Sequence, residues 1–212
     1  MLHTHQTDAW TEKWNQNFSH PDYVYGKAPN VFLKQELDKL APQTILFAAE
    51  GEGRNAVYAA QRGWKVSAFD ISTAGRQKAL RLAAENGVAL DYVVGELPEL
   101  DFADESFDAI ALIYAHFPAN IKSAYHKILA QKLKKGGVVI FEAFSKKHLE
   151  YRSRNPAVGG PSNAESLFSA QEIRSDFQDF DVQVLEEKTI SLNEGFLHNG
   201  TGSVIRFVGV KK

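Results

Sequence analysis

The chain has 212 residues, 44% of them hydrophobic, which is enough for one globular domain with a full core. Its formal net charge of −2 provides no basic field for phosphates, which argues against nucleic acid as a main partner. The absence of cysteine excludes disulfides, a thiolate nucleophile and cysteine-ligated metals. No signal-peptide pattern and no apolar run of about 18 residues occurs, so we expect a soluble cytoplasmic protein without a membrane partner.

An aromatic segment opens the chain. Trp10, Trp14 and Phe18 are spaced so that a helix would place them on one face. That face either packs on the domain as plain structure or forms a lid over a bound ligand, and we treat residues 1–30 as a candidate aromatic lid. A second helix is predicted over 31–40.

The most informative stretch combines a strand, a glycine-rich turn, a helix and a second strand. An apolar run at 45–49 predicts a buried strand, EGEG at 50–53 predicts a tight turn, and the pattern at 54–62 predicts a helix. The strand at 65–69 ends in Asp70. Such a glycine turn lets a ligand approach the backbone, and an acidic residue after the second strand can accept hydrogen bonds from two ribose hydroxyls. The unit predicts a nucleoside-containing cofactor, although an ordinary turn with strain-relieving glycines is the alternative.

The alternation of strands and helices then continues. Helices are predicted over 73–85 and 120–133, and strands over 90–94, 107–114 and 138–141. This order predicts an α/β fold with a Rossmann-like, doubly wound and mostly parallel sheet. Ligands in such sheets bind at the carboxyl ends of the strands.

The last third of the chain departs from this alternation. Residues 146–163 are polar and irregular and too long for a simple connection, so we expect a substrate loop. A short helix begins at Ser169, with Glu172 at the capping-box position. Strands at 181–192 and 203–210 are separated by a short loop and must pair antiparallel. They complete a seven-stranded sheet with a C-terminal antiparallel hairpin.

The order of these signals resembles the class I S-adenosylmethionine-dependent methyltransferases over nearly the whole chain. The motifs that carry the resemblance are EGEGRNA at 50–56, FDIS at 69–72, FDAI at 107–110 and LKKGG at 133–137. Four further motifs resemble those of a bacterial branch that includes tellurite-resistance and thiopurine-type methyltransferases. They are YGKAPNVFL from Tyr25, HFP at 116–118, GGP at 159–161 and NEGFLHNG at 193–200. We expect residues 1–212 to form a single methyltransferase domain.

The resemblance implies S-adenosylmethionine as the cofactor. The resemblance implies that Gly51 and Gly53 approach the methionine part of the cofactor. It also implies that Asp70 holds the ribose and that Glu96 accepts a hydrogen bond from the adenine amino group. The chain departs from the family at Phe47 and Ala49, where an acidic residue and a glycine are usual, and we hypothesise that Glu50 takes over the ammonium contact. The residues predicted to bind the cofactor are Glu50, Gly51, Gly53, Asn55, Asp70, Ile71, Glu96, Leu97 and Tyr114.

The expected reaction is methyl transfer to a small-molecule acceptor with a soft nucleophile, such as a thiol or a selenium or tellurium oxyanion. Such an acceptor needs little help with deprotonation, whereas an oxygen or nitrogen acceptor needs a base. His116, after the fourth strand, is the predicted catalytic residue, and His198 is the other candidate base. The residues predicted to bind the substrate are Tyr25, Arg152, Arg154 and His198. Each has a competing interpretation. His116 can be a histidine at a helix start that only hydrogen-bonds locally, and His198 can belong to a plain turn. The two arginines can be solvent-exposed, and Tyr25 can be plain packing. The other histidines lack metal-ligand spacing, so no metal is expected.

Three other functions stay open at this point. A non-catalytic S-adenosylmethionine-binding regulator is kept open by Phe47 and Ala49. A nicotinamide-dependent oxidoreductase shares the fold class, but Ala56 occupies the position of its third glycine, and neither LKKGG nor the closing hairpin is required by a dinucleotide domain. A methyltransferase acting on protein or RNA suits neither the mild acidity nor the long loop. The acceptor, and the choice between monomer and homodimer, are not fixed by the sequence.

Overall fold

The computed structural model describes the backbone of residues 2–212 and the side chains of residues 9–212. Its strands are β1 (Thr44–Ala48), β2 (Lys65–Asp70), β3 (Asp91–Val94), β4 (Phe107–Ile113), β5 (Leu133–Phe144), β6 (Phe180–Glu194) and β7 (His198–Lys211). Its helices are α1 (Leu2–Phe18), α2 (Val31–Leu37), α3 (Arg54–Gln61), α4 (Thr73–Glu85), α5 (Lys122–Lys132), α6 (His148–Arg154) and α7 (Ala170–Asp176). None of the described helices is long and apolar enough to cross a membrane.

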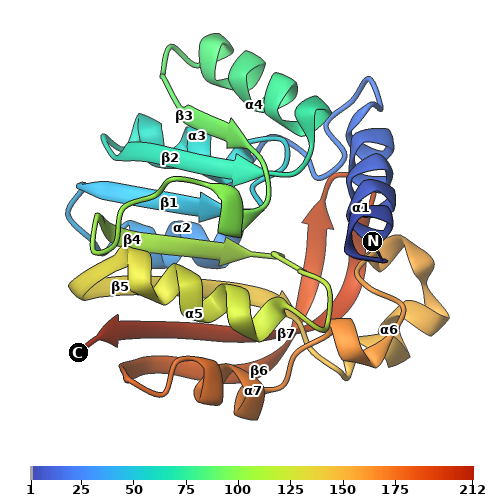
Figure 1. Cartoon of the computed structure of the whole chain (residues 1–212). Coiled ribbons are helices and arrows are strands. Elements are labelled where there is room, and N and C mark those ends of the chain that lie inside the picture. The colour runs from blue at the N-terminus through green and yellow to red at the C-terminus, as the bar shows by residue number, and fades with distance from the viewer. Residues whose placement is uncertain (1) are drawn as a thin grey trace.

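The seven strands form one sheet in the order β3-β2-β1-β4-β5-β7-β6. Strands β1 to β5 pair in parallel, and β7 pairs antiparallel with both β5 and β6. This confirms the predicted Rossmann-like sheet with a C-terminal antiparallel hairpin. In Figure 1 the parallel strands point toward the end of the sheet where α1 and α6 lie.

Helices cover both faces of the sheet because alternate strand residues point to opposite sides. Ile45 and Phe47 of β1 pack in one apolar cluster with α2, α3 and α4. Leu46 and Ala48 belong to the other cluster, with α5 and α7. The near-continuous apolar runs of the central strands therefore match burial on two faces.

Two predicted boundaries are wrong for identifiable reasons. The predicted loop at 193–200 is mostly strand, because β6 and β7 continue to the pair Glu194 and His198. The predicted helix end at LKKGG already belongs to β5, which begins at Leu133 and tolerates Gly136 at φ +74° beside an irregular register with β4. The hairpin extension matters most, because it brings the far end of the chain to the carboxyl ends of the parallel strands.

The segment 146–163 is also more regular than predicted. It contains α6 and a 3-10 turn at Pro156–Val158, and Asn155 caps that turn by accepting from the Ala157 N–H at 3.1 Å. The capping box of Ser169 and Glu172 before α7 is confirmed. The long connection is thus an ordered wall rather than an irregular loop.

Candidate active site

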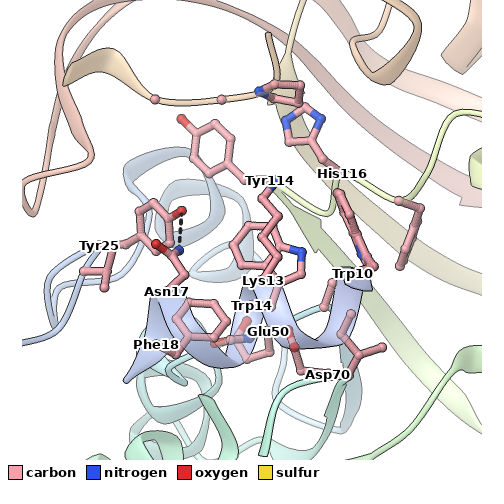
Figure 2. A pocket seen from close by; sticks show the side chains of 18 of the residues that line it. Trp10, Lys13, Trp14, Asn17, Phe18, Tyr25, Glu50, Asp70, Tyr114 and His116 are labelled. Carbon is pink, nitrogen blue, oxygen red and sulfur yellow. Dashed lines mark hydrogen bonds between the residues drawn. The ribbon is translucent and has the colours of Figure 1, made fainter. Parts of the chain in front are cut away.

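One cavity of about 1120 Å³ lies at the carboxyl ends of the parallel strands. Its walls come from α1, from the loops after β1, β2, β3 and β4, from the segment that follows α6, and from the tip of the β6–β7 hairpin. Figure 2 shows the side chains of α1 on one side of it, with Tyr114 and His116 opposite. Of the predicted site residues, the cavity is lined by Tyr25, Glu50, Gly51, Asn55, Asp70, Ile71, Glu96, Leu97, Tyr114, His116, Arg152 and His198.

Glu50 begins the floor of the cavity, directly after β1. One carboxylate oxygen accepts from the backbone N–H groups of Asn55 at 2.9 Å and Ala56 at 2.8 Å, at the start of α3. Free N–H groups at a helix start stabilise a carboxylate, which fixes this side chain in the turn. Burial nevertheless raises the pKa of Glu50 to about 7.

Asp70 ends β2 beside this turn. Its two carboxylate oxygens accept from the N–H groups of Gly51 and Ser72, each at 2.9 Å. Burial raises the pKa of Asp70 to about 6. A carboxylate has about four lone-pair sites, so two remain for a ligand's hydroxyl groups.

The two glycines of the turn play different parts. Gly51 lies in the cavity wall at φ +61°, and a Cβ there would come within 2.8 Å of the Phe18 ring. Gly53 begins α3 at φ +85° and faces Ala79 of α4, where a Cβ would come within 2.5 Å of the Ala79 Cβ. Gly53 is outside the cavity lining, so its conformation and the close packing of α3 on α4 explain it.

Helix α1 covers this floor with its aromatic face. Trp10 and Trp14 contact each other edge to face, and Trp14 stacks on Phe18 with ring centroids 5.4 Å apart. Asn15 holds the helix in place, because its side-chain oxygen accepts from the Ser72 hydroxyl at 2.8 Å at the start of α4. Residues of α1 thus line the cavity, and the aromatic lid stays a prediction. The sequence reasoning missed Lys13 and Asn17, which also line the cavity from α1.

Ile71 after β2 and Glu96 and Leu97 after β3 line another part of the cavity, and the Tyr125 hydroxyl lies 3.4 Å from a Glu96 carboxylate oxygen. Glu96 is the residue that the resemblance assigns to the adenine amino group.

The opposite end of the cavity is built around buried polar residues at β4 and β5. Tyr114 follows β4 at φ +52°, and its hydroxyl donates to Glu142 at 3.1 Å. Glu142, only 1% exposed, also accepts from Asn30 at 2.7 Å and Arg206 at 2.6 Å. This network connects four distant segments, and no local motif in the sequence marks it.

His116 lies in the cavity wall with both ring nitrogens engaged. Nδ1 is 3.0 Å from the Ser166 carbonyl oxygen and therefore donates to it, and Nε2 accepts from the Phe144 N–H at 3.4 Å. Burial lowers the pKa of His116 to about 3, so the ring is neutral. The contacts favour a polar wall at this position over a free base.

His198 begins β7 beside the same wall. Its Nδ1 is 3.2 Å from the Glu194 carboxylate, and its ring contacts those of Tyr25 and Tyr114 with centroids 4.5 and 4.6 Å away. Burial lowers the pKa of His198, while the Glu194 carboxylate acts in the opposite direction. His198 is thus not the residue of a plain turn, the alternative that the sequence left open.

The structure separates the two predicted arginines. Arg152 lines the cavity and donates from Nε to the Gly160 carbonyl oxygen at 3.0 Å. Arg154 ends α6 with an exposed side chain outside the lining. Across the residues that the structure describes, no cluster of three or more potential metal-ligating side chains occurs.

The residues of the floor fit a cofactor with an ammonium group, a ribose and a flat base. Asp70 is buried and Glu50 half-buried, and burial raises the pKa values of both carboxyls, so a cationic ligand group nearby would stabilise their charged forms. Trp14 and Tyr25 offer aromatic faces, which attract a cation such as a sulfonium. The donor set therefore suits S-adenosylmethionine.

Comparison with known proteins agrees with this geometry. Residues 45–137 match the family model described as a methyltransferase domain. This match confirms the predicted enzyme class, a methyltransferase, and with it the predicted cofactor, S-adenosylmethionine. No curated protein matches the sequence significantly.

Solved structures match the fold at low sequence identity. One is a protein described for the conversion of a disulfide bond into a thioacetal group during echinomycin biosynthesis. Its TM-score is 0.77, and it is 17% identical over 97% of this chain and 91% of that one. Another is magnesium protoporphyrin IX methyltransferase from Synechocystis with bound SAH, with a TM-score of 0.70 and 17% identity over 97% and 99%. TehB from Haemophilus influenzae gives a TM-score of 0.68 and 14% identity over 85% of this chain and 61% of that one. At these identities the likeness supports the fold.

Proposed function

We propose that this methyltransferase, as a single domain over residues 1–212, methylates a small-molecule acceptor with a soft nucleophile, a thiol or a selenium or tellurium oxyanion. The observation that carries the proposal is the roofed cavity, in which a carboxylate-rich floor and a wall of histidines and aromatic rings face each other under α1. A roof of this kind admits a small molecule and excludes a folded protein or a nucleic acid helix. The sulfur chemistry named for the echinomycin-pathway protein is consistent with this proposal.

In this proposal the floor binds the cofactor. Asp70 would hold the ribose, Glu50 would face the ammonium, and Ile71 with Leu97 would enclose the base. When bound, S-adenosylmethionine supplies a methyl group already activated on a sulfonium. The chain's task is to align the acceptor with that methyl group and to exclude water.

The lid and the opposite wall perform that task. Trp14 and Phe18 of α1 close the floor from solvent, and the Asn15 anchor ties the lid to the start of α4. Tyr25 and Arg152 line the acceptor end, the first with a ring face and the second with a guanidinium. A soft acceptor suits this wall, since a soft nucleophile needs less help with deprotonation than an oxygen or nitrogen acceptor.

Calorimetric titration tests the proposal, with S-adenosylmethionine, S-adenosylhomocysteine and, as a control, NADH. We expect micromolar binding of the first two and none of NADH. Screening of thiols, selenite, tellurite and phenols should then find turnover with one of the soft acceptors. Cofactor binding without turnover on any of them would favour a regulator, and turnover on phenols alone would contradict the soft acceptor.

A further inference from the structure

Three histidines differ in what their ring nitrogens do: His116 and His198 line the acceptor end of the cavity, and His148 lies behind it, hydrogen-bonded to Gly159 of the lining. Both nitrogens of His116 are engaged by the backbone, as described above. The same holds for His148, whose Nε2 donates to the Gly159 carbonyl oxygen at 3.1 Å while Nδ1 accepts from the Ser203 N–H at 3.3 Å. Burial lowers the pKa values of both rings, so both are neutral. They have no lone pair to offer a substrate.

His198 is held by one nitrogen only. A carboxylate accepts but does not donate, so the contact of Nδ1 with Glu194 at 3.2 Å places the proton on Nδ1. Nε2 then carries the lone pair. Glu194 is itself fixed in place, because Arg54 donates to it at 3.1 Å and Asn30 donates to its other oxygen at 3.1 Å. The carboxylate therefore sets both the tautomer and the orientation of the ring.

Among the described residues, Nε2 of His198 has no hydrogen-bond partner. Within the same part of the chain, the only fully buried side-chain nitrogen or oxygen without a partner is Nε2 of His126, in the core beside α7. Nε2 of His198 therefore keeps some accessible surface. His198 lines the cavity, with Nε2 on the side of Gly159, another residue of the wall. A carboxylate, an oriented imidazole and an open lone pair are the arrangement of a general base.

We propose that His198 is the general base for the acceptor and that Glu194 is its positioning residue, so the acceptor enters as a protonated thiol and not as a preformed oxyanion. This inference rests on the proposed function and selects one of its acceptor classes. The thiol proton passes to Nε2, the thiol sulfur bonds to the methyl carbon, and the electrons of the broken carbon–sulfur bond stay on the cofactor sulfur. The products are a methyl thioether, S-adenosylhomocysteine and a proton, which the imidazolium, paired with Glu194, releases to solvent.

Several titratable groups face this ring. Besides burial, which lowers the pKa of His198, Glu194 raises this pKa and Arg54 lowers it. The other groups are the phenols of Tyr25 and Tyr114 and the imidazoles of His116 and His148. Since both other imidazoles are neutral and the phenols stay protonated at pH 7, Glu194 and Arg54 decide the charge at this position.

The first test needs no turnover. Nitrogen-15 NMR of histidine-labelled protein with S-adenosylhomocysteine should show His198 with its proton on Nδ1 at pH 7.5, identified as the signal lost in His198→Gln. Glu194→Gln should mix the two tautomers, since an amide can accept or donate. A proton on Nε2 in the unaltered protein would overturn the proposal.

The second test compares two thiols. 2-Mercaptoethanol must lose a proton at pH 7, whereas 4-nitrothiophenol is already ionised. His198→Gln should lower kcat for 2-mercaptoethanol by about 100-fold. It should change kcat for 4-nitrothiophenol by no more than about threefold. His116→Gln, the matched variant on the same wall, should affect both thiols equally.

Other outcomes separate the two proposals. If His198→Gln lowers kcat equally with both thiols, or lowers it with neither, the assignment of His198 as the base is overturned. The proposal of a soft acceptor is not affected by that result. If the unaltered protein binds S-adenosylhomocysteine but methylates tellurite and neither thiol, the thiol selection is overturned. Unchanged affinity for S-adenosylhomocysteine verifies the fold of each variant.

Discussion

The two ends of the cavity are built from the chain in different ways. The end that we propose for the cofactor is local, because the turn after β1, the end of β2 and the loop after β3 follow one another between residues 50 and 97. The end that we propose for the acceptor joins α1, the end of β4, the segment after α6 and the tip of the β6–β7 hairpin, which lie far apart in the sequence. The first end carries carboxylates, and the second carries imidazoles and a guanidinium. Changes at the first should therefore act on cofactor affinity, and changes at the second on the acceptor.

The largest effect is expected at Asp70, the carboxylate at the centre of the cofactor end. Asp70→Ala should weaken binding of S-adenosylhomocysteine by about 100-fold or more, because each hydrogen bond to a charged group contributes about 1.5–3 kcal/mol. Titration calorimetry measures the loss. Asp91→Ala, which removes an exposed carboxylate at the start of β3, is the control and should leave the affinity unchanged. Equal affinities in the two variants would mean that Asp70 does not touch the cofactor.

A smaller loss is expected at Glu50. The amide oxygen of Glu50→Gln can still accept from the Asn55 and Ala56 N–H groups, so the turn is kept and only the charge is removed. Loss of the charged contact to the ammonium should weaken S-adenosylhomocysteine binding by about 10-fold at pH 8. A Kd equal to that of the unaltered protein would mean that Glu50 does not contact the ammonium. In that case no residue would replace the acidic side chain that is usual in the family at the position of Phe47.

The pH dependence of the same affinity sharpens this assignment. Burial raises the pKa of Glu50 to about 7, so below that pH the free protein holds a proton on this carboxyl. An ammonium beside it favours the carboxylate and expels that proton, so affinity should fall as the pH decreases from 8 to 6, by up to tenfold per pH unit once below pH 7. Calorimetry in buffers of different ionisation enthalpy should detect the released proton. In Glu50→Gln the affinity should depend less on pH. The dependence that remains should come from Asp70, whose pKa burial raises to about 6.

The same contrast explains what the sequence could predict. Strand ends, the glycine turn and Asp70 are signals within short windows, so periodicity and one motif place the cofactor end in the correct fold. Gly53 shows the limit of such a motif, because a glycine needed for packing on Ala79 and one that lines a cavity look alike in a sequence.

The sequence named Tyr25, His116, Arg152 and His198 for the acceptor end, and all four line the cavity, but it could not show which groups these side chains contact. His198 enters the site because the hairpin keeps its register to the pair Glu194 and His198, and the sequence predicted a loop there. The partners of Glu194, Asn30 and Arg54, come from other segments that the fold brings together. The spacing of four residues between Glu194 and His198 does not indicate their contact without the strand pairing.

The smallest effect separates two arginines that the sequence could not tell apart. Arg152 faces the cavity and Arg154 faces solvent, although both belong to the end of α6. With 3-mercaptopropionate as acceptor, Arg152→Gln should raise KM about three- to tenfold, since a guanidinium in a roofed site is less screened than one at the surface. With uncharged 2-mercaptoethanol the same variant should leave KM unchanged, and Arg154→Gln should leave it unchanged with both thiols. An equal rise in both variants would mean that the charge acts through the general field of the protein and not through a contact in the cavity. Because that field decays within about 10 Å at 0.1 M salt, repeating the pair at higher salt distinguishes the two causes: a contact inside the roof persists, and a field effect fades.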